Sequence, residues 1–441
     1  METIIRETKL GKIKGLVYDD AYEFKGIPYA VTKRFEKPER IDEWEEEILD
    51  ATKQEIDCYQ YATFRDDSEV FYTKEFVSGK KYIYAESPMT LTITTPKVTK
   101  KNPVLVFIHG GGWETGNVGD LPYGECFEYA KRDIILVSVG YRLNVFSLYE
   151  NGNYGLLDQK CAIEWVYDHI ADFGGDPHQI TLMGQSAGAM SIMDQVYSQN
   201  LKGKIRGIIT MSGGGVMPLI SKPFTKEQAA EFWKKVRERA GVSAEEVKTV
   251  DVAKLWDAWY EESRSANSPQ AVVPGIDGEI IKETPQKTVF KGEDLDVPAM
   301  IGITSQDFMA PFMYQMALRY GLRNSLYRRS RVYCYFFDRT LPGNLYKAYH
   351  AADLWYMFGN MEKCWRPFEK TDYDLSRMMM DYVANFVRYQ NPNGRDLPQW
   401  DYITPLQRRF RWLDGESDGM IQPIKAFKKT VISFTKDKGP M

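Results

Sequence analysis

One stretch decides the fold: Ile180-Thr-Leu-Met-Gly-Gln-Ser-Ala-Gly-Ala189. It begins as an apolar run typical of a buried strand, and residues 187–195 continue with the composition of a helix. In between, Gly184-x-Ser186-x-Gly188 predicts a tight turn that holds a serine hydroxyl above the end of the strand. The glycines are needed because side chains there would collide with the strand and helix backbones. We therefore predict Ser186 as a nucleophile; the alternative is a glycine-rich turn with an incidental serine.

Apolar runs recur on both sides of this turn and alternate with segments of helical periodicity, of which Leu156–Phe173 is the clearest. This alternation predicts an α/β fold, in which helices flank both faces of a mostly parallel central sheet. No linker interrupts the pattern, so we expect residues 1–441 to form a single domain. The runs that have the length and β-branched content of buried strands are Val104–His109, Ile134–Tyr141, Ile180–Gly184, Ile205–Ser212, Val297–Thr304 and Val332–Phe337.

Two regions depart from this alternation. The first hundred residues are richer in short β-like pieces and in acidic residues, and we expect them to add an N-terminal antiparallel edge to the sheet. Residues Ala229–Glu261 are polar with a helical pattern, and we expect a helical cap segment over or beside the site.

Charge and composition argue against several function classes. With 43% hydrophobic residues, 27% charged residues and a net charge of −4, the chain has the composition of a soluble globular protein. This charge favours neither a nucleic acid nor a membrane surface as partner, and we interpret the basic cluster Arg328, Arg329 and Arg331 as a solvated face. No stretch approaches the roughly 18 apolar residues of a membrane span. The oligomeric state is left open.

Five cysteines are scattered without metal-ligand spacing, and the opening residues lack the apolar segment of a secretory signal. An odd, sparse set of cysteines in such a chain favours free thiols in a reducing compartment. We therefore expect a cytoplasmic protein that holds no metal. The five are Cys58, Cys126, Cys161, Cys334 and Cys364.

A second glycine-rich segment follows the run at Val104–Ile108 and reads His109-Gly-Gly-Gly-Trp113. Consecutive glycines after a strand can turn their N–H groups toward one point, because no Cβ obstructs them. Such donors, with the N–H of the residue after the nucleophile, would stabilise a tetrahedral intermediate. We assign Gly111, Gly112 and Ala187 as this oxyanion hole; a purely structural turn is the alternative.

A serine nucleophile needs a general base, and elimination among the four histidines identifies it. His109 belongs to the glycine segment, His169 lies on the helix before the nucleophile strand, and His178 lies in a turn. His350 follows the last strong strand. Enzymes that carry their nucleophile on this kind of turn have the chain order Ser, acid, His, which places the base at this position. We predict His350 as the general base.

The acidic residue that would hydrogen-bond to His350 is expected between Ser186 and His350 in the sequence, on a loop after a strand. Asp307 comes directly after Val297–Thr304 and would orient the imidazole and stabilise its protonated form. Asp338, after the following strand, is the second candidate. Asp353 lies only three residues from His350, too near to be a natural partner.

With these residues in place, the chain resembles the type-B carboxylesterases, the α/β-hydrolase group that includes the cholinesterases. The resemblance spans nearly all of the chain, and it implies that Ser186, Asp307 and His350 form a catalytic triad without cofactor or metal. The motifs that carry it are Phe24-Lys-Gly-Ile-Pro-Tyr-Ala30 with Arg34-Phe35, Asn153-Tyr-Gly-Leu-Leu-Asp-Gln159, Phe173-Gly-Gly-Asp-Pro177, Ser186-Ala-Gly188, Pro274 with Asp277-Gly278, His350-Ala-Ala-Asp-Leu354, Asn391-Pro-Asn-Gly394 and Trp400.

Several positions depart from the family pattern. The acid is usually Glu, and Asp307 is one methylene shorter, so His350 or its loop must approach more closely. Gln185 stands where Glu is common, and we expect it not to affect the chemistry. Cys58 fits the first half-cystine of a disulfide common in secreted members, but Pro88 stands where the second would be.

The segment between acid and base is short, since 350 − 307 = 43 residues, where relatives usually carry a longer helical excursion. We therefore expect a more open site. Leu219 stands where cholinesterases place an aromatic acyl-pocket residue, which suggests a roomier pocket. Together with Leu219, the residues that we expect to bind apolar parts of a substrate are Trp113, Met190 and Phe312.

The predicted function is a serine carboxylesterase that hydrolyses small carboxylic esters through an acyl-enzyme. Two alternatives stay open. An amidase, thioesterase or lactonase would use the same residues, and a non-catalytic binding module would use the fold alone.

Overall fold

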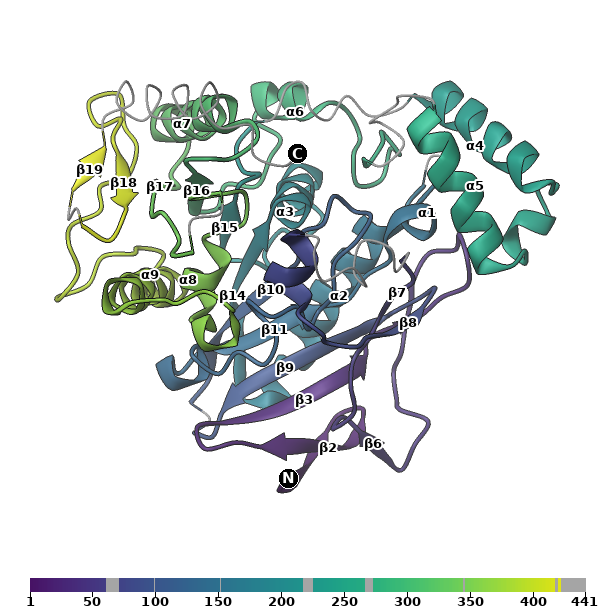
Figure 1. Cartoon of the computed structure of the whole chain (residues 1–441), viewed down its shortest axis with the longest axis horizontal. Coiled ribbons are helices and arrows are strands. Elements are labelled where there is room, and N and C mark those ends of the chain that lie inside the picture. Colours follow the sequence, from purple (N-terminus) through teal and green to yellow (C-terminus); the bar gives the residue numbers. More distant parts are fainter. Residues whose placement is uncertain are drawn as a thin grey trace.

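The computed structural model describes residues 1–60, 71–98, 100–150, 152–216, 225–265, 273–343, 346–416 and 419–421. Thirteen strands of these residues form one twisted sheet (Figure 1). The strand order is β1-β2-β3-β9-β11-β10-β14-β15-β16-β17-β18-β19, with β6 paired to β2. The N-terminal strands therefore form one edge and the C-terminal strands the other.

The middle of the sheet is parallel from β11 to β18. Its strands from β10 to β17 are buried almost throughout, because helices cover both faces, and this is why they appear in the sequence as continuous apolar runs. All six predicted runs are strands, so this part of the prediction is confirmed. The bounds are β10 Asn102–Ile108, β11 Ile135–Val139, β14 Gly175–Gln185, β15 Gly207–Met211, β16 Ala299–Thr304, β17 Val332–Phe337 and β18 Phe410–Leu413.

The N-terminal edge is antiparallel, as predicted, from β1 through β2 and β3 to β9, which pairs with β11. A short antiparallel strand, β19, closes the opposite edge. The bounds are β1 Thr3–Thr8, β2 Gly11–Val17, β3 Ala21–Pro28, β6 Ile48–Asp50, β9 Thr90–Pro96 and β19 Met420–Ile421. Three small pairs lie outside this sheet: β4 Ala30–Val31 with β5 Glu39–Arg40, β7 Ile56–Cys58 with β8 Ile83–Ala85, and β12 Leu148–Tyr149 with β13 Gly152–Asn153.

Helices pack on both faces of the sheet. Alternate residues of β10 belong to different hydrophobic clusters: Val106 packs with α2, α3 and α7, and Phe107 packs with α8 and α9. This follows from the two-residue side-chain period of a strand. The bounds are α2 Tyr154–His169, which a 3₁₀ turn over Ile170–Phe173 extends, α3 Ala187–Ser198, α7 Ala310–Tyr327, α8 Leu354–Phe358 and α9 Lys370–Tyr389.

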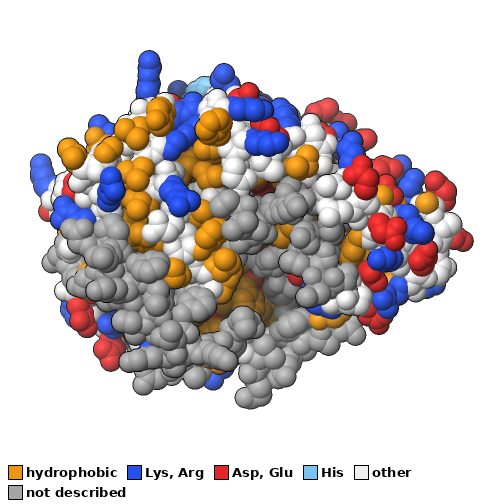
Figure 2. All heavy atoms as spheres, turned by 90° about the horizontal axis from the view of Figure 1, so that it is seen from above, with side chains coloured by type: hydrophobic (Ala, Val, Ile, Leu, Met, Phe, Trp, Pro, Cys, Tyr) orange, Lys and Arg blue, Asp and Glu red, His pale blue; other side chains and the backbone are white. Residues whose placement is uncertain are grey.

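The predicted cap segment is helical. It forms α4, Lys226–Ala240, and α5, Val252–Ser265, which pack against each other at one end of the molecule (Figure 1). Charged side chains of both signs cover this end (right in Figure 2), whereas hydrophobic side chains line a hollow near the middle of the same face. Arg264 of α5 forms a 2.7 Å ion pair with Glu114, so the cap lies beside the glycine segment. The remaining helices are α1 Asn144–Ser147 and α6 Pro285–Lys291.

All five cysteines lie in the described residues as free thiols, four of them buried. Within the described ranges, none of the helices is long and apolar enough to cross a membrane.

Candidate active site

The turn at Ser186 joins β14 to α3. Ser186 adopts φ 54° and ψ −123°, a left-handed conformation that is strained for a residue with a side chain. A Cβ on Gly184 would lie 2.7 Å from the Gly188 backbone, and one on Gly188 would lie 2.1 Å from Ile108 O. The Ser186 N–H donates to Met211 O at 2.8 Å. Both glycines are therefore required by close approach, and the turn presents a half-buried serine at the carboxyl edge of the sheet.

The glycine segment after β10 lies against this turn. A Cβ on Gly110 would be only 3.1 Å from Ser186 Cβ. Gly111 (φ +111°) and Gly112 (φ +67°) have conformations that side chains rarely adopt. Their N–H groups have no hydrogen-bond acceptor within the described part of the chain. The N–H of Ala187 opens α3 and has no partner inside the helix.

Two side chains that no sequence motif indicates hold the glycine segment after β10 in place. Tyr141 stacks on the His109 ring at a centroid distance of 4.6 Å, and its hydroxyl donates to His109 O at 2.8 Å. Gln60 bonds both the N–H and the carbonyl of Gly116, each at 3.0 Å. Because Gln60 is distant in sequence and has no motif around it, only the fold reveals this contact.

His350 and Asp307 meet at the carboxyl edge of the sheet, beside the turn. His350 Nδ1 lies 2.9 Å from Asp307 Oδ1, and the Thr304 hydroxyl donates to Asp307 Oδ2 at 3.1 Å. The Gln306 N–H donates to Ala348 O at 3.0 Å and ties the two segments together. Burial acts to lower the pKa of His350, but the adjacent Asp307 carboxylate outweighs it, so the pKa lies above its usual value.

The other two acids considered from the sequence have different partners. Asp338 Oδ2 accepts a hydrogen bond from the Trp412 indole at 3.1 Å. Asp353 Oδ2 accepts one from the Tyr335 hydroxyl at 2.7 Å, and burial raises the pKa of Asp353 to about 6. Of the three, Asp307 is the one that contacts His350.

Gln185, which we expected not to affect the chemistry, contacts the imidazole. Its Nε2 lies 3.2 Å from His350 Nε2. An amide NH₂ can only donate, so His350 Nε2 accepts this bond and Nδ1 carries the proton directed at Asp307. Among the bonds of the described residues, none joins the Ser186 hydroxyl to His350. In this state, the lone pair that a general base would use is therefore occupied by Gln185.

A buried carboxylate also holds the segment that carries His350. Glu75, on a π-helical turn over Thr73–Val77, is fully buried and accepts bonds from five side chains. One is the hydroxyl of Tyr349, the neighbour of His350. Its partners lie more than 270 residues away from it in the sequence, so no local pattern could have shown this role. The other four donors are Trp355 Nε1 at 3.1 Å, Cys364 Sγ at 4.0 Å, Trp365 Nε1 at 2.9 Å and Arg366 Nε at 2.8 Å.

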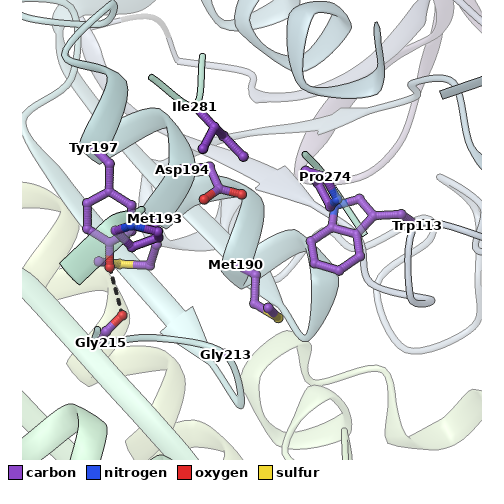
Figure 3. Close-up of a pocket in the computed structure, with 10 residues that line it drawn as sticks. Trp113, Met190, Met193, Asp194, Tyr197, Gly213, Gly215, Pro274 and Ile281 are labelled. Carbon is purple, nitrogen blue, oxygen red and sulfur yellow. Dashed lines mark hydrogen bonds between the residues drawn. The ribbon is translucent and has the colours of Figure 1, made fainter. Parts of the chain in front are cut away.

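A small pocket of about 20 Å³, partly open to solvent, begins beside the turn at Ser186 (Figure 3). Trp113 and Met190, two of the residues expected to bind substrate, line it. The Trp113 indole donates to Ser191 Oγ at 2.9 Å, which fixes the ring against α3. Phe312 lies in the first turn of α7 and is not among the lining residues, and Leu219 lies outside the described residues.

The sequence profile of the carboxylesterase family matches residues 2–320 and 309–426. The two pieces overlap in the segment between Asp307 and His350 that we expected to be short. Gut esterase 1 of Caenorhabditis elegans is 31% identical over 342 residues, which cover 72% of this chain and 57% of the relative. Para-nitrobenzyl esterase of Bacillus subtilis (strain 168) is 29% identical over 481 residues, 93% of this chain and 94% of the relative.

Solved structures agree in fold. A para-nitrobenzyl esterase structure superposes with a TM-score of 0.81 at 25% identity and covers 97% of this chain and 99% of its own. A thermophilic para-nitrobenzyl esterase reaches a TM-score of 0.83 at 24% identity with the same coverage. Together these matches support ester hydrolysis as the reaction and the α/β-hydrolase fold as its scaffold. The chain belongs to the carboxylesterase family.

Proposed function

We propose that this protein is a serine carboxylesterase that acts through an acyl-enzyme, with Ser186 as nucleophile, His350 as general base and Asp307 as the acid that orients the base. The observation that carries the proposal is the 2.9 Å contact between His350 Nδ1 and Asp307 Oδ1 beside a strained serine turn. Strained backbone at Ser186 supports a catalytic role, because such strain is concentrated at functional sites.

In the first step, His350 Nε2 releases Gln185 and accepts the proton of Ser186 Oγ. The serine oxygen attacks the ester carbonyl carbon, and the carbonyl oxygen becomes an oxyanion. The N–H groups of Gly111, Gly112 and Ala187 bind this oxyanion. They suit the task because they are left without partners in the described residues and are held in place beforehand.

In the second half of the reaction, the ester C–O bond breaks and His350 returns the proton to the leaving alcohol. A water molecule then gives its proton to His350 and attacks the acyl-enzyme, which releases the carboxylic acid and restores Ser186. Asp307 stays ionised throughout and stabilises the imidazolium formed in each half. Trp113 and Met190 would contact apolar parts of the substrate.

The rival reactions use the same residues, so substrates must separate them. We expect kcat/KM for an ester to exceed that for the amide of identical acyl group by at least a hundredfold, because an amine is the poorer leaving group and the site carries no additional acid for it. Matched ester, thioester and amide substrates measured with one enzyme preparation test this. A higher kcat/KM for the amide or the thioester would contradict the assignment, and no turnover of any substrate would favour a binding module.

Gln185→Glu is expected to shift the pH profile of kcat/KM. The rise of activity on its acidic side should move to higher pH by roughly one unit or more. A carboxylate 3.2 Å from His350 Nε2 would stabilise the imidazolium and raise the pKa of His350 further above its usual value. Since the base must be neutral to act, activity would begin at higher pH. Gln185→Leu is the matched control, because it removes the amide without adding charge and should produce no such upward shift. An unchanged limb in Gln185→Glu would show that Gln185 does not contact the working base.

A further inference from the structure

One aromatic side chain contacts the imidazole of His350 and has no part in the reaction described above. Phe308 follows Asp307 in the chain, and its ring centre lies 4.7 Å from that of His350, with an angle of 57° between the two planes. This separation and tilt are typical of attractive contacts between rings. Phe308 is therefore an immediate neighbour of the proposed base.

The backbone on both sides of Phe308 is held in place. Residues 305–309 form the short connection from β16 to α7. On one side of Phe308, the Gln306 N–H donates to Ala348 O at 3.0 Å, and on the other side the Ala310 N–H donates to Asp307 O at 3.3 Å. The place of the ring beside His350 thus follows from a connection that is anchored at both ends.

Phe308 remains open to solvent although it touches the base. Its side chain is 47% exposed, and the His350 side chain is 26% exposed. The other two contacts of the imidazole, Asp307 at Nδ1 and Gln185 at Nε2, are polar and buried. Single exposed aromatic residues are common, but this one presents apolar surface to a bound ester directly beside the base.

The reaction brings the alcohol part of the ester to this place. His350 Nε2 returns the proton to the leaving oxygen, so that oxygen must come within hydrogen-bond distance of Nε2. Nε2 belongs to the ring that Phe308 contacts, and the first carbons of the alcohol are bonded to the leaving oxygen, so they come close to the Phe308 ring. The acyl part instead follows the carbonyl carbon to Ser186 and the glycine segment.

We propose that Phe308 selects esters by their alcohol part and favours alcohols that carry an aromatic ring close to the ester oxygen. The proposal rests on the esterase activity proposed above and adds a specificity-determining residue to it. An aromatic alcohol part that packs on the half-exposed Phe308 ring removes apolar surface of both from water, and the contact between the rings adds to the gain. The contact ends when the alcohol leaves, so it contributes to acylation of Ser186 and not to hydrolysis of the acyl-enzyme.

The test uses three simple esters that place one ring on either side of the ester group. Benzyl acetate carries the ring on the alcohol part, ethyl phenylacetate carries it on the acyl part, and ethyl acetate carries none. Two ratios of kcat/KM are measured: benzyl acetate to ethyl acetate, the alcohol ratio, and ethyl phenylacetate to ethyl acetate, the acyl ratio. Differences in intrinsic reactivity cancel when each ratio is compared between variants.

Phe308→Ala is expected to lower the alcohol ratio by about 5- to 30-fold and to leave the acyl ratio unchanged, because it removes the ring that the alcohol part contacts. Phe308→Leu keeps more of the packing and should lower the alcohol ratio in the same direction. Phe308→Tyr keeps the ring and should retain the alcohol ratio within about twofold. Phe290→Ala is the matched control, since it removes a 94% exposed ring from α6 and should change neither ratio.

The outcomes separate this role from others. If Phe308 only positions His350, its loss slows all three esters alike and leaves both ratios unchanged, which overturns the proposal. A fall in the acyl ratio as large as that in the alcohol ratio also overturns it, and so does an equal fall of the alcohol ratio in Phe308→Tyr. Failure of the unaltered enzyme to hydrolyse any of the three esters would instead contradict the esterase activity.

Discussion

Ser186→Ala is expected to lower kcat by about 10⁵- to 10⁶-fold, which would leave only the contribution of binding and of the oxyanion hole. The change removes the attacking oxygen, and no hydroxyl on a neighbouring residue of the turn can replace it. The fold should be preserved, because the Ser186 side chain forms no hydrogen bond within the described residues and alanine can keep the backbone bond to Met211. Steady-state hydrolysis of a chromogenic ester measures the effect.

Ser198→Ala is the matched control. It removes a hydroxyl from the far end of the same helix, where the group donates to Gln195 O at 2.8 Å. We expect its kcat to stay within about twofold of the original, since the hydroxyl is a local helix contact. A residual rate in Ser186→Ala above about one hundredth of the original, in a preparation free of other esterases, would exclude Ser186 as the nucleophile.

Asp307→Asn is expected to lower kcat by about 10⁴-fold, a typical cost of disturbing the acid of such a triad. The amide can present its NH₂ to His350 Nδ1, which would move the ring proton to Nε2 and leave no lone pair for the serine proton. It would also remove the negative charge that holds the pKa of His350 above its usual value. The measurement is kcat, together with the pH at which activity begins.

Asp338→Asn separates this role from a general loss of charge near the site. Asp338 follows the next strand of the sheet, and its Oδ2 accepts from the Trp412 indole. We expect a small loss of stability and little change in kcat, because Asn can still accept that bond. Intact activity in Asp307→Asn combined with lost activity in Asp338→Asn would show that the acid has been misassigned.

Much of the fold could be predicted because the informative signals are local. A central parallel strand must be apolar on both faces, so β14 and β17 are visible in the sequence as continuous runs. The turn at Ser186 leaves an equally local trace, since Gly184 and Gly188 are positions where a Cβ would meet backbone. Helix ends were less well predicted: the periodicity continues to Phe173, but the α-helix ends at His169 and a 3₁₀ turn follows.

Contacts between distant segments could not be predicted in the same way. The bond between Gln185 and His350 depends on how two loops approach across the edge of the sheet, and nothing beside Gln185 in the sequence indicates it. The five bonds to Glu75 likewise require the turn over Thr73–Val77 to pack against residues 349–366 of the C-terminal half.

The most direct test of the central claim is the stoichiometry and site of labelling by an organophosphate. Mass spectrometry after treatment with diethyl nitrophenyl phosphate should show one diethylphosphoryl group per chain, located on the peptide that contains Ser186, with loss of ester hydrolysis in parallel. Ser186→Ala should remain unlabelled under the same conditions. Labelling of another residue, or full inactivation without a label on Ser186, would contradict the account.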